Sequence, residues 1–355
     1  MKIAIEEHCF TQYFIDHMQA RQKYPKMEAV IENGKKVWRW WDSAEEYHTF
    51  LPEFILNKLC DLGEGRLKDM DEAGIDMQVL SFNPDIAQLD AADATALTRE
   101  VNDILYAAVK KHPDRFASFA ALALKAPEAA ANELERAVKQ LGFKGTMVLS
   151  HVEGEFIDAK KYWPVFEKAA ALGVPIYIHP IHPSPDRLKL YSGYPQLTGS
   201  MWGFSVEGGL TAIRLICSGV FDAYPDLKII LGHLGVALPF WMSRIDDRVQ
   251  SPADIGMVSS LEIERGADVT RLTKKLKKLP SQYFKDNFFV TTSGMLWQPA
   301  LLCTQMALGI DKILFAADYP FEPGKEAVQF METLPISNSD KEKLFHSNAE
   351  RLLGL

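Results

Sequence analysis

Short runs of consecutive apolar residues alternate along this chain with longer stretches in which apolar residues recur every three or four positions. The runs are rich in β-branched residues and are bounded by Gly, Pro or Asp, which is typical of strands buried on both faces of a parallel sheet. Eight strands are predicted, at Ile3–Glu7, Ile75–Phe82, Phe116–Ala121, Gly145–Leu149, Val174–His179, Lys228–Gly232, Asn287–Thr291 and Lys312–Ala317.

The stretches between the runs predict amphipathic helices. Such helices are expected at Leu97–Lys111, Pro127–Leu141, Trp163–Leu172, Gly208–Ala223 and Pro299–Leu308. Pro127 suits the first turn of its helix, and Gly142 and Gly173 stand where C-terminal caps belong. Strands that alternate with helices predict the α/β class, either as a (β/α)₈ TIM barrel or as an open, doubly wound sheet.

The distribution of polar residues favours the barrel. They fall at the carboxyl ends of the first, fifth, sixth and eighth runs, and in a barrel all these ends surround one mouth. In an open sheet, strands so far apart in order need not converge. The pattern predicts one barrel domain over residues 1–355, with an excursion around residues 9–70 that passes over the mouth or into a subunit interface.

Composition excludes several classes of protein. The 355 residues are 47% apolar and carry a net charge of −8, which argues against a nucleic-acid partner. No apolar stretch approaches the roughly 20 residues that span a bilayer, and the amino-terminal residues do not form a signal peptide. The four cysteines include no CxxC pair, as expected for free thiols in a reducing compartment. A cytoplasmic location follows as the prediction.

Two of the candidate functional residues end the first strand. Glu6 and His8 are two positions apart, and side chains at that spacing share one face of a strand. Taken alone, this pair is equally typical of the exposed end of a strand. His179 closes the fifth run directly before Pro180, where either a metal ligand or a hydrogen-bonded core histidine would fit. His182 follows in a loop and is the weaker candidate.

Two further candidates end later strands. His233 lies between Gly232 and Gly235 after the sixth run, and it suits a ligand, a general acid or base, or a core histidine. Asp318 ends the eighth run and is expected either to need a charged partner or to cap a helix. Together, these nitrogen and oxygen donors at strand ends predict a site for one divalent ion, with Zn²⁺ or Mn²⁺ preferred.

At these residues the chain resembles the aminocarboxymuconate-semialdehyde decarboxylase-like branch of the amidohydrolase superfamily, which includes the γ-resorcylate, 2,3-dihydroxybenzoate and 5-carboxyvanillate decarboxylases. The resemblance runs almost from end to end. It is clearest in 4–8 (AIEEH), 66–71 (RLKDMD), 112–116 (HPDRF), 229–235 (IILGHLG), 241–248 (WMSRIDDR), 291–294 (TTSG) and 313–322 (ILFAADYPFE).

The resemblance implies a TIM barrel of the metal-dependent hydrolase type with one divalent ion, held by Glu6, His8, His179 and Asp318. It also implies that Asp318 and His233 are catalytic and that Asp318 protonates the ring carbon bearing the carboxylate. The implied substrate-binding residues are Arg244, Phe204 and Arg66. Arg244 equally suits a surface salt bridge with Asp246 or Asp247, and packing alone would explain Phe204.

Two positions depart from the family pattern. Several relatives have glutamate where this chain has Val236, so no carboxylate is available there to orient His233. His151 follows the fourth run as either a substrate contact or a loop residue, with the loop favoured.

The predicted function is therefore metal-dependent, non-oxidative decarboxylation of an aromatic, ortho-hydroxybenzoate-type acid or of a conjugated acid. The alternatives are a metal-dependent hydrolase or hydratase acting on a lactone, amide or C–C bond, and a catalytically silent barrel. The expected partners are a small carboxylic acid substrate and further copies of the chain, in a homodimer or homotetramer, with no nucleic acid and no membrane.

Overall fold

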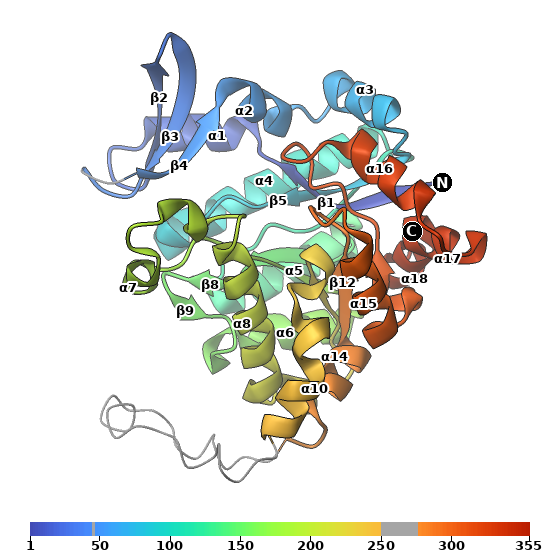
Figure 1. Ribbon diagram of the computed structural model, residues 1–355. Helices are drawn as coiled ribbons and strands as arrows, with labels where there is room; N and C mark the ends of the chain where they lie inside the picture. Colours follow the sequence, from blue (N-terminus) through green and yellow to red (C-terminus); the bar gives the residue numbers. More distant parts are fainter. Residues whose placement is uncertain (45–46, 250–275) are drawn as a thin grey trace, which may run out of the picture.

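A computed structural model describes residues 1–44, 47–249 and 276–355 (Figure 1). Every predicted barrel strand is present. The eight strands are β1 (Ile3–Cys9), β5 (Met77–Phe82), β6 (Phe116–Ser118), β7 (Thr146–Leu149), β10 (Ile176–His179), β11 (Ile229–Leu231), β12 (Phe288–Thr291) and β13 (Ile313–Leu314). Several strands are shorter than predicted. The last apolar residues of a run, such as Phe315–Ala317, lie after the end of the hydrogen-bonded strand.

Backbone hydrogen bonds close these strands into a ring. One parallel sheet has the order β1-β5-β6, and the other has the order β13-β12-β11-β10-β7. Between β6 and β7, the nitrogen of Ala120 donates to the carbonyl of Gly145 (2.8 Å). Between β13 and β1, the nitrogen of Ile5 donates to the carbonyl of Phe315 (3.0 Å). The order around the ring follows the chain, which is the TIM-barrel topology that the sequence predicts.

Apolar side chains fill the barrel. The inner cluster takes residues from all eight strand segments, and the carboxy-terminal helix α18 (Asn348–Leu353) closes one end with Ala349 and Leu353. The barrel residues of this cluster are Ile3, Ile5, Val79, Ala117, Phe119, Met147, Tyr177, Ile230, Phe289 and Leu314. A second, larger cluster packs the outer face of the strands against the helices.

The helices follow the predicted alternation. The main covering helices are α4 (Ala91–Lys111), α5 (Pro127–Leu141), α6 (Trp163–Leu172), α8 (Gly203–Ser218), α10 (Leu238–Val249), α14 (Pro280–Asn287), α15 (Gln298–Leu308) and α16 (Gly324–Thr333). Gly142 and Gly173 cap their helices in the left-handed conformation, as predicted. The helix predicted over 208–223 is instead two, because Gly219 (φ +84°) ends α8 and α9 (Val220–Ala223) follows.

Shorter elements connect these helices and strands. They are η1 (Ile86–Gln88), β8 (His151–Val152), β9 (Glu155–Phe156), η2 (Lys160–Tyr162), α7 (Pro185–Leu188), η3 (Lys189–Tyr191), η4 (Pro195–Thr198), η5 (His233–Gly235), η6 (Ile310–Lys312), α17 (Asn338–Glu342) and η7 (Lys343–Ser347). None of the helices in the described ranges has the length and apolar character needed to cross a membrane. The cytoplasmic location stays a prediction.

The excursion at residues 9–70 has a substructure that the sequence analysis did not assign. It contains α1 (Gln12–Ala20), a three-stranded antiparallel sheet of β2 (Lys26–Glu32), β3 (Lys35–Trp41) and β4 (Tyr47–Pro52), then α2 (Glu53–Cys60) and the start of α3 (Glu64–Ala73). Figure 1 shows the sheet at one side of the barrel, and the stacked rings of Phe14 and Trp40 join α1 to it. Its place over the mouth or in an interface stays a prediction, as does the single-domain boundary.

Candidate metal centre and its surroundings

A β-bulge in β1 decides which way the Glu-x-His pair points. Ile3 and Ile5 face the barrel interior, so regular alternation would turn Glu6 and His8 outward. The register with β5 instead shifts between Ile5 and Glu7, and Glu6 has a φ of +83°. One inserted residue reverses the side of the sheet to which each later side chain in the strand points. The bulge therefore brings Glu6 and His8 to the interior and sends Glu7 outward.

The four residues predicted as ligands lie together at the carboxyl end of the barrel. Ligand atoms of Glu6, His8 and His179 all lie within 4.8 Å of one another, and all three residues are buried. His8 Nε2 is 3.0 Å from Asp318 Oδ1, and His179 Nε2 is 3.8 Å from Glu6 Oε1. One carboxylate from β1, two imidazoles and the Asp318 carboxylate form a donor set suited to one divalent ion.

The electrostatics of the cluster favour a cation. Burial raises the pKa of Glu6, and burial lowers the pKa of His179 to about 3. Neutral imidazole is the form that binds a metal. Glu6 Oε1 has no hydrogen-bond partner among the described residues, although it is fully buried. A buried carboxylate oxygen without a donor is costly, and a bound cation would remove that cost.

Hydroxyl groups on the neighbouring strands hold the other oxygen of Glu6. Tyr177, on β10, donates a hydrogen bond to Glu6 Oε2, and Thr291 Oγ1, on β12, donates to the same atom at 3.0 Å. Burial and the nearby carboxylate raise the pKa of Tyr177 well above its usual value, so the hydroxyl keeps its proton. Sequence reasoning missed this support, although Thr291 belongs to the 291–294 motif and Tyr177 alternates inward on its strand.

His233 lies beside the cluster with one ring nitrogen fixed. Its Nδ1 donates to the carbonyl of Ser293 (2.9 Å), and its Nε2 lies 3.9 Å from Glu6 Oε1. Burial acts to lower the pKa of His233, but the charges of Glu6 and Asp318 raise it overall. The imidazole is therefore oriented by a backbone carbonyl, and it favours the protonated form near the two carboxylates.

Val236 stands where several relatives were expected to carry a glutamate, and its side chain packs against α8. A Cβ added to Gly208 would lie 3.5 Å from its Cγ1, and one added to Gly209 would lie 3.6 Å from its Cγ2. The two glycines thus admit an apolar side chain at this position. Orientation of His233 does not need a carboxylate here, because Ser293 supplies the acceptor.

Arg66, one of the implied substrate-binding residues, is fully buried. Its guanidinium donates to the carbonyls of Asp61 (2.9 Å) and His8 and to Gln78 Oε1 (3.1 Å). It also lies over the Tyr319 ring at 4.4 Å. These contacts support the backbone that carries His8, and a role for Arg66 in binding substrate stays a prediction.

Glu7 gives the same region a second support. Its Oε1 accepts from the nitrogen of Ala317 (2.8 Å), the residue before Asp318, and its Oε2 accepts from Gln78 Nε2 (2.9 Å). Burial raises the pKa of Glu7 to about 8. This outward-facing residue connects the ends of β1 and β13 and so sets the separation between His8 and Asp318.

Of the other residues singled out from the sequence, some lie near the metal cluster and others lie away from it. Phe204 lies near the cluster, with its ring 6.4 Å from that of His179 and 5.0 Å from that of His182. Arg244 lies on the exposed side of α10, and no contact joins it to the cluster in the described ranges. His151 is buried, donates through Nε2 to the carbonyl of His182 (3.0 Å) and accepts from the nitrogen of Gly154 (3.1 Å). It has the loop role that the sequence analysis favoured.

Fold and cluster together define a TIM-barrel protein with a candidate divalent-metal centre at the carboxyl ends of its strands. The family model described as amidohydrolase matches residues 56–355. The chain belongs to the amidohydrolase family.

Curated relatives and solved structures resemble the chain over nearly all of its length. The γ-resorcylate decarboxylase of a Polaromonas species is 38% identical over 314 residues, which cover 85% of this chain and 90% of that protein. The structure of dihydroxybenzoic acid decarboxylase from Polaromonas sp., with manganese and 2-nitroresorcinol, is 34% identical with a TM-score of 0.80, covering 100% of this chain and 97% of the other. A 5-carboxyvanillate decarboxylase from Novosphingobium aromaticivorans, with manganese and 4-hydroxy-3-methoxy-5-nitrobenzoic acid, is 33% identical with a TM-score of 0.83, covering 100% and 96%.

Proposed function

We propose that this protein is a metal-dependent, non-oxidative decarboxylase of an aromatic acid that carries a hydroxyl group ortho to its carboxylate. The convergence of Glu6, His8, His179 and Asp318 at one end of the barrel carries the proposal. The relatives that cover most of the chain are decarboxylases of hydroxylated aromatic acids, and manganese is present in the structures of two of them.

Glu6, His8, His179 and Asp318 are the residues that would hold the ion, either Mn²⁺ or Zn²⁺. When bound, the ion would supply positive charge that holds the substrate carboxylate and phenol oxygen side by side. Tyr177 and Thr291 keep Glu6 Oε1 directed at the cluster by holding Oε2. Phe204, beside His179 and His182, would limit the position of the aromatic ring.

Proton transfer would fall to Asp318 and His233. The Asp318 carboxyl would donate a proton to the ring carbon that bears the carboxylate. The C–C bond to the carboxylate would then break, CO₂ would leave, and the bonding electrons would restore the aromatic ring. Burial raises the pKa of Asp318, but the hydrogen bond from His8 and the histidine charges lower it overall, so a neighbouring proton source is required. His233, with its raised pKa, provides one.

His151 and Val236, the two departures from the family pattern, are both engaged within the fold. His151 is held by backbone groups of Gly154 and of His182, and Val236 packs against α8. Neither supplies a base for a water molecule. Incorporation of ¹⁸O from labelled water into the organic product would distinguish hydrolysis from decarboxylation.

The test is CO₂ release by manganese-loaded protein from a panel of ortho-hydroxybenzoates and 5-carboxyvanillate. Turnover is expected for at least one acid, with a loss of at least about a hundredfold in kcat for Asp318→Asn, since a proton donor contributes roughly 10²–10⁴-fold. Asp311→Asn, at an exposed aspartate paired with Lys343, is the matched control. No turnover by protein with verified metal content would overturn the proposal.

We also propose that the chain forms a homodimer or homotetramer. Large apolar side chains are exposed on the 188–210 segment and on α10, including Leu190 (81%), Met201 (70%), Trp202 (57%) and Phe240 (71%). Exposed apolar groups of this size favour burial against another chain. Light scattering after gel filtration would measure the mass, and a monomer at micromolar concentration would contradict the proposal.

A further inference from the structure

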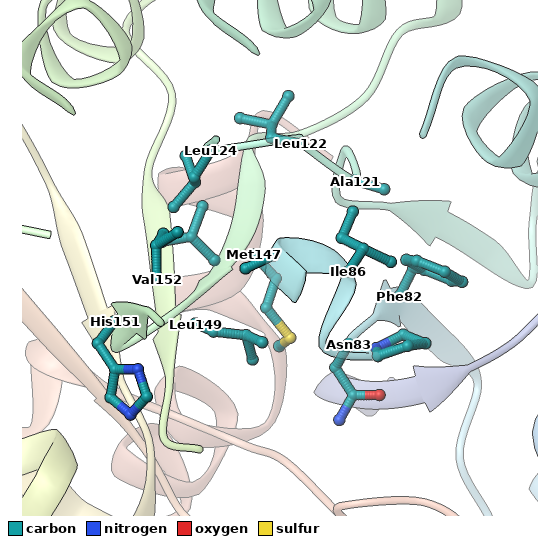
Figure 2. A pocket seen from close by; sticks show the side chains of 13 residues that line it. Phe82, Asn83, Ile86, Ala121, Leu122, Leu124, Met147, Leu149, His151 and Val152 are labelled. Carbon is teal, nitrogen blue, oxygen red and sulfur yellow. The ribbon is translucent and has the colours of Figure 1, made fainter. Parts of the chain in front are cut away.

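A small, open cavity lies at the carboxyl ends of β5, β6 and β7 (Figure 2). The last residues of β5 and β7, together with residues that follow β5, β6 and β7, form its wall. They are Phe82, Asn83, Pro84, Ile86, Ala87, Ala121, Leu122, Leu124, Met147, Val148, Leu149, His151 and Val152. No residue of the four-membered metal cluster is among them.

Eleven of the thirteen lining residues have apolar side chains. Figure 2 shows Leu122 and Leu124 at the upper edge of the view, with the polar side chains of Asn83 and His151 at the lower edge. Both ring nitrogens of His151 are already engaged by backbone groups, so this residue offers the cavity only its ring. A group that enters here would gain by removing apolar surface from water and would find few polar partners.

The strand register places this cavity directly beside the metal cluster. Leu149 is the register partner of His179 on the adjoining strand, and parallel partners face the same side of the sheet. On the opposite flank, Phe82 is the partner of Cys9, so these two side chains face the outer side of the sheet, away from His8. The cavity thus occupies the arc of the mouth between the two strands that carry His8 and His179.

We propose that this cavity is a substrate subsite that accepts an alkyl substituent on the ring of the aromatic acid. The inference rests on the proposed function, which places the carboxylate and its ortho hydroxyl at the metal centre. A ring held there projects its remaining substituents toward the surrounding mouth. Leu149 joins the two sites, and the apolar wall beyond it selects a hydrocarbon chain over a charged or hydroxylated group.

The experiment measures kcat/KM of manganese-loaded protein for 2-hydroxybenzoates that carry no substituent or a methyl, propyl or pentyl chain at each other ring position. For chains at one position, kcat/KM is expected to rise by about fourfold per methylene while the chain remains inside the cavity. The readout is the ratio of kcat/KM for the propyl acid to that for the unsubstituted acid.

Two variants are designed to remove the gain in kcat/KM that the alkyl substituent gives, each in a different way. Ala87→Phe, in η1, fills the cavity, and Leu149→Asn makes its inner wall polar at similar volume. Each is expected to reduce the ratio to within about twofold of one. Ala92→Phe adds the same ring to the exposed surface of α4, outside the cavity, and should retain the wild-type ratio.

The outcomes separate this proposal from the proposed function. Turnover of the unsubstituted acid without any gain from an alkyl chain would overturn the subsite and leave the decarboxylase intact. A gain that persists in both cavity variants would also overturn it. If no acid is decarboxylated, the affinities of the same acids for manganese-loaded wild type and Ala87→Phe are measured by calorimetry. Affinity that depends equally on the length of the alkyl substituent in both proteins refutes the subsite.

Discussion

The hydrogen bond from Tyr177 to Glu6 provides a sensitive test of the metal centre, because Tyr177→Phe removes one oxygen atom and keeps the ring. The Tyr177 ring is fully buried in the barrel interior, where it packs near Phe119. Its hydroxyl donates to Glu6 Oε2 and lies 3.0 Å from Thr291 Oγ1. The substitution therefore leaves the packing in place and frees the carboxylate to rotate away from the ion.

The size of the effect follows from the remaining partner. Groups that orient a metal ligand are typically worth 10- to 100-fold in metal affinity. Thr291 still donates to Glu6 Oε2 at 3.0 Å in the variant, so the expected loss lies near the lower limit, at about tenfold or 1.4 kcal/mol. Removing the second hydroxyl with Thr291→Val as well should move the loss toward about a hundredfold.

Competition between the protein and a fluorescent chelator for Mn²⁺ measures this affinity directly. Tyr162→Phe is the matched control, since Tyr162 is also buried and donates to a carboxylate, Glu155 Oε2 at 3.2 Å, away from the cluster. It should bind Mn²⁺ like the wild type. A Tyr177→Phe protein whose affinity stays within about twofold of wild type would refute the role assigned to this hydroxyl.

Three further predictions are tested by urea unfolding. Arg66→Met leaves buried acceptors without a donor and should lower the free energy of unfolding by about 3 kcal/mol; a loss below about 1 kcal/mol would contradict a supporting role. Burial lowers the pKa of His151 in the folded protein. Below about pH 6.5 the His151 imidazole is therefore protonated in the unfolded chain but remains neutral in the folded one. Wild type should therefore lose stability from about pH 7 to pH 5, and His151→Gln should show a smaller loss; equal losses would refute this. Gly145→Ala places a Cβ 2.3 Å from the Pro175 carbonyl oxygen and should cost more than Gly142→Ala, which meets no atom within 4 Å; similar costs would show that the contact relaxes.

Much of the fold is predictable here because strand and helix signals reinforce each other. The apolar runs are continuous, since strands of this barrel are buried on both faces, and the capping glycines mark where helices end. The excursion at residues 9–70 was harder to interpret. Its strand β2 (Lys26–Glu32) is only partly buried, and buried, intermediate and exposed residues mix along it without a clean alternation.

The cluster was predicted for a partly incorrect reason. Spacing of two residues does place Glu6 and His8 on one face, but the chosen face depends on the bulge at Glu6. No residue type in the sequence marks that bulge, since glutamate seldom adopts a positive φ. A substrate role for Arg66 was expected from the family resemblance alone, and the burial of its guanidinium is evident only from the packed structure.

The closing contact between β13 and β1 also governs when the metal centre can exist. The nitrogen of His8 donates to the carbonyl of Tyr319 (2.8 Å), joining segments from opposite ends of the polypeptide. Glu6 and His8 precede Asp318 by about 310 residues, so they are synthesised well before it. Until Asp318 arrives, β1 has an unpaired edge and the donor set is incomplete. A complete donor set therefore requires that the last strand has docked against the first.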